Sequence, residues 1–171
     1  MSRENQVARR AVLVTPEPAG NIEDEPDEPD WAQWPESDPD CTHALSRGLA
    51  GYLAAVATAV GVAAEGTSHE VTDTATAYLA LVERPPNRSG RDLMLVWSEH
   101  AGWVVSVETD PAEPPMVLSR LGGDPLPPPQ VVARFVADAL AGRCRDGVPS
   151  MRHSRPVLSD RLDRYVATFT S

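Results

Sequence analysis

Side chains that could act as general acids, bases or nucleophiles are scattered along this chain, and few stand close together in the sequence. His100 follows Glu99 directly, and a carboxylate beside an imidazole can support acid–base chemistry. Adjacent residues in a turn usually point apart, however, so we interpret this pair as part of a solvated turn. Cys144 and His153 could pair as thiolate and imidazolium, but no sequence signature of a cysteine nucleophile surrounds them. We therefore predict no catalytic residue.

Metal and phosphate ligands are equally sparse. The two cysteines, Cys41 and Cys144, show no zinc-binding spacing, the four histidines stand apart from one another, and the sequence contains no glycine-rich phosphate loop. We predict no metal site and no cofactor. Both cysteines are expected to be free thiols in a reducing cytoplasm, although a disulfide between them stays open.

Charge is distributed unevenly along the chain. The net charge is −10, and all fifteen basic residues are arginine. Residues 1–40 hold eleven acidic residues against three arginines, whereas residues 41–171 hold fourteen against twelve. An acidic chain without a basic stripe argues against direct nucleic-acid binding through phosphates and against adhesion to an anionic membrane.

Residues 1–40 are expected to be a disordered, acidic, proline-rich tail, because they offer too few apolar side chains to offset the entropy of ordering. Trp31 and Trp34 are three residues apart in this tail, so one helical turn would present both rings on the same side. We predict that these two residues bind a protein partner. Two alternatives stay open: the tail docks on the arginine-rich segment 143–164 of its own chain, or it only solubilises the chain.

Apolar periodicity predicts the elements that position these residues. Apolar side chains at three- and four-residue steps predict helices over residues 42–60, 129–140 and, more briefly, 159–168. Short apolar runs bounded by turn residues predict strands over residues 76–82, 92–97, 103–108 and 116–121. The glycine in the turn at 98–102 is expected to adopt a positive φ. We interpret the uncharged run 48–64 as a buried helix rather than a membrane span.

These elements predict an α+β fold. The expected architecture is a two-layer sandwich, in which a three- to four-stranded antiparallel meander packs against two main helices. Residues 41–143 would form this domain, and residues 144–171 would form an arginine-rich linker with a short C-terminal helix. The far face of such a sheet can be open to water. Tyr78, Trp97 and Trp103 cannot all point inward unless their strand phases align, so we expect some of the three on that open face. The candidate ligand-binding residues are Trp97, Trp103 and Asp124, on the open face or at the strand ends.

Two stretches carry a resemblance to a known family. They are "GRDLMLVWSEHAGW", residues 90–103, and "LGGDPLPPPQVVARFV", residues 121–136. Over roughly residues 45–143 the chain resembles a small domain of actinobacterial proteins that forms a family of unknown function. The resemblance implies an α+β domain and an actinobacterial origin. It implies no activity, so it assigns no role to any residue.

The function we expect is that of a cytoplasmic, non-enzymatic protein-binding or regulatory module with an acidic tail that recruits a partner. The first residues lack the apolar stretch of a secretory signal. The alternative is a small-ligand-binding domain or a small enzyme that uses the open sheet face. A pocket with converging polar groups and a perturbed titratable residue would favour this alternative, and a flat or convex face would favour protein binding.

Overall fold

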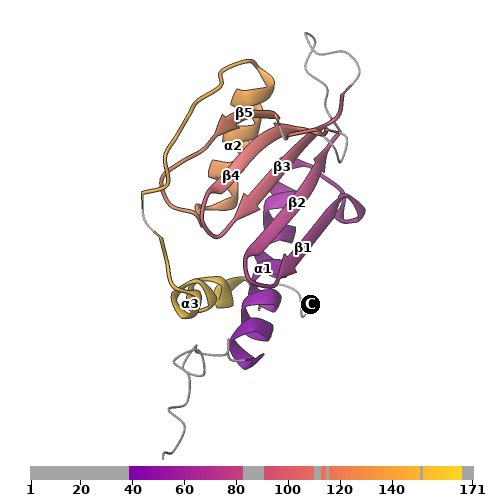
Figure 1. Cartoon of the computed structure of the whole chain (residues 1–171). Helices are drawn as coiled ribbons and strands as arrows, with labels where there is room; N and C mark the ends of the chain where they lie inside the picture. The colour runs from indigo at the N-terminus through magenta and orange to yellow at the C-terminus, as the bar shows by residue number, and fades with distance from the viewer. Residues whose placement is uncertain (1–38, 83–90, 110–112, 115, 151, 167–171) are drawn as a thin grey trace, which may run out of the picture. The chain divides into compact units, whose positions relative to one another are not determined.

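A computed structural model describes residues 39–82, 91–109, 113–114, 116–150 and 152–166. Within these residues one helix precedes a run of strands, and two helices follow it (Figure 1). The elements are α1 (Pro39–Val60), the 3-10 turn η2 (Ala64–Gly66), β1 (Thr67–Val71), β2 (Ala75–Leu81), β3 (Leu93–Ser98), β4 (Gly102–Val107), β5 (Met116–Arg120), α2 (Pro129–Leu140) and α3 (Arg155–Val166). The expected α+β class is confirmed.

The sheet has five strands, so the expected count of three to four was wrong. The missed strand is β1, whose sequence TSHEV is short and polar and lacks the apolar alternation that marks a half-buried strand. It pairs antiparallel with β2, from Thr67 opposite Leu79 to Val71 opposite Ala75. Backbone pairing with β2, rather than an apolar pattern of its own, therefore accounts for β1.

All five strands form an antiparallel meander in the order β1-β2-β3-β4-β5, the topology expected from the short connections. The hairpin between β3 and β4 closes with the Ala101 N–H donating to Ser98 Oγ at 3.0 Å. Gly102 has a φ of +66°, which confirms the glycine predicted for this turn. The hairpin fixes the register that places Trp97 opposite Trp103.

The helices α1 and α2 pack on the same face of the sheet (Figure 1). Alternate side chains of β2 and β3 point to this face and join apolar side chains of α1 and α2 in one core, as the period-2 pattern of a half-covered strand requires. No described helix is both long enough and apolar enough to cross a membrane.

The C-terminal helix α3 is part of the same core. Leu158 and Leu162 are fully buried in it. A Cβ atom on Gly48 of α1 would lie 2.7 Å from the Cβ of Leu162, and one on Gly51 would collide with the Tyr165 carbonyl. The two glycines therefore let α3 approach α1 more closely than any larger residue would.

The segment between α2 and α3, which we expected to be an irregular linker, adds backbone pairing to the outer edge of β5. Arg120 bridges to Asp146 and Gly123 to Pro149, both in the parallel sense. The Arg120 N–H donates to the Arg145 carbonyl at 2.8 Å, and the Gly147 N–H donates to the Arg120 carbonyl at 3.0 Å. This edge of the sheet is thereby covered by the chain itself.

Candidate functional site

Trp97 and Trp103 point into the core, not onto the open face of the sheet. Their exposed fractions are 0% and 1%. Their strand phases align with the core-facing residues Leu95 and Val105. Of the three aromatic residues considered for the open face, Tyr78 is the one that lies there. A direct role for these indoles in ligand binding remains a prediction that the structure does not test.

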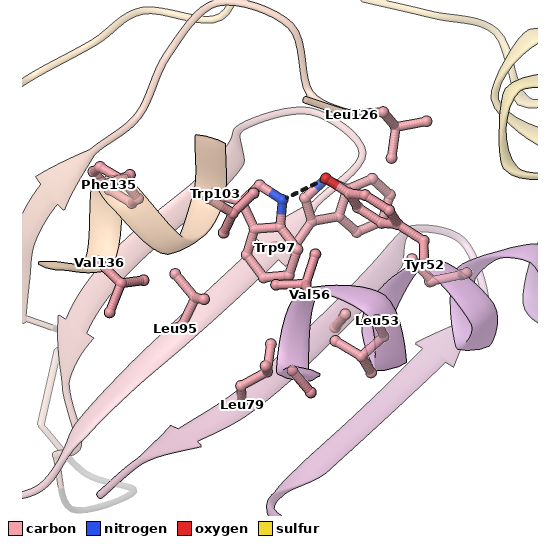
Figure 2. Close-up of a cluster of buried hydrophobic side chains, with 14 of the residues drawn as sticks. Tyr52, Leu53, Val56, Leu79, Leu95, Trp97, Trp103, Leu126, Phe135 and Val136 are labelled. Carbon is pink, nitrogen blue, oxygen red and sulfur yellow. Dashed lines mark hydrogen bonds between the residues drawn. The ribbon is translucent and has the colours of Figure 1, made fainter. Parts of the chain in front are cut away.

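The three candidate ligand-binding residues do lie near one another, because a polar network joins them at the end of the core. Trp103 Nε1 donates to the Tyr52 hydroxyl at 3.0 Å (Figure 2). The Tyr52 hydroxyl donates in turn to the Pro127 carbonyl at 2.7 Å, and Trp97 Nε1 donates to the Pro125 carbonyl at 2.6 Å. Both indoles thus fix the proline-rich loop that follows Asp124, directly or through Tyr52.

Tyr52 shows what this environment does to a titratable group. Burial raises the pKa of its hydroxyl above the ordinary value, although the hydrogen bond from Trp103 opposes that rise. The hydroxyl stays protonated at physiological pH and serves as both donor and acceptor. Sequence periodicity placed Tyr52 on the apolar face of the first helix, but it gave no signal for this polar role.

Asp124 is held by Arg161 of α3. The two guanidinium nitrogens of Arg161 donate to the two carboxylate oxygens at 2.9 and 2.6 Å, and the Leu126 N–H donates to Oδ1 at 3.0 Å. The hydrogen bonds from Arg161 hold the pKa of Asp124 below its ordinary value. His153 Nε2 lies 3.0 Å from Arg161 Nη1 and 3.9 Å from Asp124 Oδ1. A carboxylate with these partners is suited to anchoring α3 and poorly suited to accepting a proton.

A second carboxylate, Glu99, lies in the turn between β3 and β4 and is only 6% exposed. Arg155 Nε of α3 is 3.5 Å from Glu99 Oε2, and His100 Nε2 is 3.8 Å from Oε1. The Arg155 guanidinium also donates to the Thr72 carbonyl at 2.5 Å. The interpretation of this pair as part of a solvated turn was therefore wrong for Glu99, because the carboxylate is buried and Arg155 compensates its charge. Arg155 thus ties α3 to the β1–β2 and β3–β4 turns, and Arg161 ties it to the loop after β5.

The cysteines and histidines considered as nucleophiles or metal ligands do not form a common site among the described residues. Cys41 and Cys144 are free thiols, and the partner of His153 is Arg161. Among the described residues, no three histidine, cysteine, aspartate or glutamate side chains lie close enough to hold a metal ion. Trp31 and Trp34 lie outside the described residues.

The sheet face opposite α1 and α2 carries a second apolar surface, which we call the outer face. Two cross-strand rows form its centre: Tyr78, Val96 and Val104, which end at Arg120 on β5, and beside them Ala80, Met94, Ser106 and Val117. Most of these side chains are half-buried, and Val104 and Ser106 are almost fully buried. A sheet face left to water usually alternates with polar residues, so this apolar content is unusual.

Acidic side chains flank the outer face near Tyr78. Burial and the nearby carboxylates of Glu108 and Asp92 raise the pKa of Tyr78. An open hollow of about 410 Å³ lies on the other side of this ring, and Glu70 and Thr76 are among its lining residues. The open sheet face was predicted as a candidate surface, with Tyr78 among the three aromatic residues considered for it. Its other residues were not predicted, because apolar side chains on both faces of a strand hide which face the helices cover.

Comparison with known proteins gives one match. A family model described as "Family of unknown function (DUF6292)" matches residues 52–138, which is about half of the chain and runs from α1 into α2. The expected resemblance to a small domain of unknown function is confirmed. No curated protein and no solved structure matches the chain.

Proposed function

Since the chain belongs to this family of unknown function, whose description names no activity, we propose from its geometry that it is a non-enzymatic protein-binding module. Its outer face would receive an apolar surface of a partner protein. The observation that carries the proposal is the apolar centre of two cross-strand rows, formed by Tyr78, Val96, Val104, Ala80, Met94 and Val117, on the face that no described helix covers.

The composition of the outer face fits a protein interface. Tyr78, Met94 and Val96 offer aromatic, thioether and branched side chains, of which tyrosine and methionine are enriched at the centres of interfaces. Glu70, Asp92 and Glu108 supply charge near its margin. An apolar centre with a charged rim is the usual anatomy of such a surface, and this rim favours a partner with basic groups around its apolar patch.

The carboxylates that could serve an enzyme support this choice by their contacts. Asp124 and Glu99 each face an arginine of α3, so both act as anchors for that helix. The alternative of a small-ligand-binding domain is supported by a hollow of about 310 Å³ at the ends of α1 and α2. The residues that line it are apolar side chains and one glycine: Val60, Gly61, Val62, Leu81, Val82, Val136 and Leu140. Such a hollow suits a small apolar group and offers no acid or base.

The acidic tail is the second part of the proposal. Trp31 and Trp34 would supply buried area to a partner, and the acidic residues around them would keep the rings in solution and steer the encounter. Docking on the chain's own segment 143–164 is less favoured, because most of its arginines already face acidic groups of the folded domain. The ion pairs are Arg143 and Arg145 with Asp138, Arg155 with Glu99, and Arg161 with Asp124. The cytoplasm remains the predicted location.

The test compares matched charge substitutions on opposite sides of the domain. Val96→Glu places a carboxylate in the outer face, and Val131→Glu makes the same change at a 44% exposed valine of α2. Full-length protein and both variants would be used to capture proteins from cells that express the chain, and the captured proteins would be identified by mass spectrometry. We expect Val96→Glu to lose a partner that Val131→Glu retains, while circular dichroism shows all three chains folded.

A chain lacking residues 1–40 separates the tail from the outer face in the same experiment. Loss of the partner with this truncation assigns recruitment to the tail as well, and retention assigns it to the outer face alone. Identical sets of captured proteins from the wild type and the Val96→Glu variant would contradict the proposed role of the outer face.

A further inference from the structure

The two outermost strands of the sheet, β1 and β5, differ in the backbone pairing of their outer edges. The outer edge of β5 is bonded by residues 145–150, which contribute two parallel bridges. The outer edge of β1 has no strand or bridge beside it among the described residues. An edge strand with unpaired backbone groups is a ready template for another strand.

The backbone bonds of β2 show which groups of β1 point outward. The Glu99 N–H donates to the Ala75 carbonyl at 3.0 Å, so the backbone polar groups of Ala75 face β3. Ala75 is opposite Val71, and in an antiparallel ladder hydrogen-bonded pairs alternate with pairs that are not bonded to each other. The N–H and C=O groups of Val71, and of His69 two residues earlier, therefore point away from β2 and off the edge.

The surroundings of this edge suit a side chain of an added strand. Ser68, His69 and Glu70 are exposed. The open hollow of about 410 Å³ beside Tyr78 lies on the outer face between these residues and the ring. Glu70 lines the hollow, and the carboxylates of Asp92 and Glu108 act on Tyr78 from its other side. The negative potential and the aromatic ring together favour a basic side chain.

We propose that β1 binds an extended segment of a partner protein as a sixth strand, with an arginine or lysine of that segment in the hollow between Glu70 and Tyr78. The segment bonds to the outward N–H and C=O groups of His69, and its basic group meets the acidic margin of the outer face. This is recognition by strand addition, in which backbone bonds supply affinity and one side-chain pocket supplies selectivity. The inference rests on the proposed protein-binding function and specifies the form of its partner.

A proline substitution tests the backbone bond. His69→Pro removes the outward N–H without touching the β1–β2 bonds, since proline is tolerated where a strand's N–H faces solvent. His69→Ala is the matched control, because it removes the imidazole and its contact with Ser46 Oγ at 3.2 Å but keeps the N–H. The probe is a short synthetic peptide in which arginine alternates with valine, and binding to the full chain is followed by backbone amide NMR shifts.

We expect the amides of Thr67, His69 and Val71 to shift as the peptide binds. His69→Pro should weaken binding about tenfold and His69→Ala less than about twofold, since one backbone hydrogen bond separates them. Glu70→Gln should weaken binding about threefold, as for an exposed ion pair. A control peptide with glutamate in place of arginine should not bind. Absence of shifts at these three amides with millimolar peptide, or equal binding by both His69 variants, would overturn the proposal.

Other occupants of the edge give distinct outcomes. Concentration-dependent dimerisation of the wild type in sedimentation, abolished by His69→Pro, would assign the edge to a second copy and overturn the partner strand. A captured partner that is lost with Val96→Glu but kept with His69→Pro would overturn strand addition and leave the proposed function intact. Retention of the partner by both variants would contradict both.

Discussion

The inner and outer sides of β3 both carry apolar residues but have different surroundings. Leu95 and Trp97 on the inner side are fully buried under the helices, whereas Met94 and Val96 on the outer side are half-buried. Folding requires apolar residues on the inner side, because only there do α1 and α2 complete a core. The outer apolar residues exceed what the described fold uses, which makes that side the more informative one for function.

Neighbouring truncations on β3 give the largest expected contrast. Leu95→Ala should lower the free energy of unfolding by about 2–5 kcal/mol, because it leaves a cavity in a fully packed core. Val96→Ala should cost less than about 1 kcal/mol, because its side chain is only half-buried. Urea unfolding followed by tryptophan fluorescence measures both. Equal losses would mean that the outer side is as much a part of the folding core as the inner side.

Removing one tyrosine hydroxyl from the core and one from the outer face compares the contribution of polar groups to stability on the two sides of the sheet. Tyr52→Phe should cost about 1–3 kcal/mol, since it leaves Trp103 Nε1 and the Pro127 carbonyl buried without their partner. Tyr78→Phe on the outer face should change stability by less than about 0.5 kcal/mol. Thermal unfolding of both variants gives the difference, and a neutral Tyr52→Phe would show that water replaces the hydroxyl.

A smaller effect than at Leu95 or Tyr52 is expected at Asp124, outside the sheet, where a half-exposed ion pair anchors α3. The pKa of Asp124 is lowered in the folded state, so the unfolded chain binds more protons as the pH approaches the ordinary value of 3.8. The stabilisation is thus present above that value and is lost as the pH falls through the lowered one. Asp124→Asn should cost about 1 kcal/mol at pH 7 and progressively less below pH 4, measured by urea unfolding. A constant difference across pH would contradict the ion pair as its cause.

A control for this titration is Asp146→Asn. Asp146 pairs with Arg120 at 3.4 Å, but its side chain is 91% exposed. Solvent screening should leave this variant indistinguishable from the wild type at both pH values. Its stability therefore measures how much of the Asp124 effect depends on the partial burial of that ion pair.

Local sequence patterns predicted the elements that carry strong apolar periodicity. The helix over 129–140 was predicted with its observed bounds, and the strands from β2 onward lie within a residue or so of their predicted positions. The polar strand β1 could not be predicted, because its backbone bonds to β2 leave no mark on its side chains. The helix predicted over 159–168 begins at Arg155 and includes Pro156 in its first turn, where a proline lacks no bonded N–H. The apolar spacing used to find the helix started only after this turn.

In the candidate site, too, local sequence predicted some features, and tertiary contacts determined the others. Trp97, Trp103 and Asp124 were predicted as ligand-binding residues, a role that stays a prediction, and the structure joins them to one end of the core. Their arrangement as anchors depends on Arg161, which is 37 positions after Asp124 and whose contact leaves no local pattern. Sequence spacing cannot reveal a partner of this kind, because the two residues meet only when α3 packs on α1.

By itself, the sequence determined the α+β class, the meander and the two amphipathic helices, because short-range periodicity and turn residues encode them. Only the tertiary structure decided which apolar side chains of each strand are covered, which edge of the sheet the chain bonds itself, and how the charges of α3 are compensated. These depend on contacts between residues distant in sequence, and burial is a property of the packed layers rather than of any one segment.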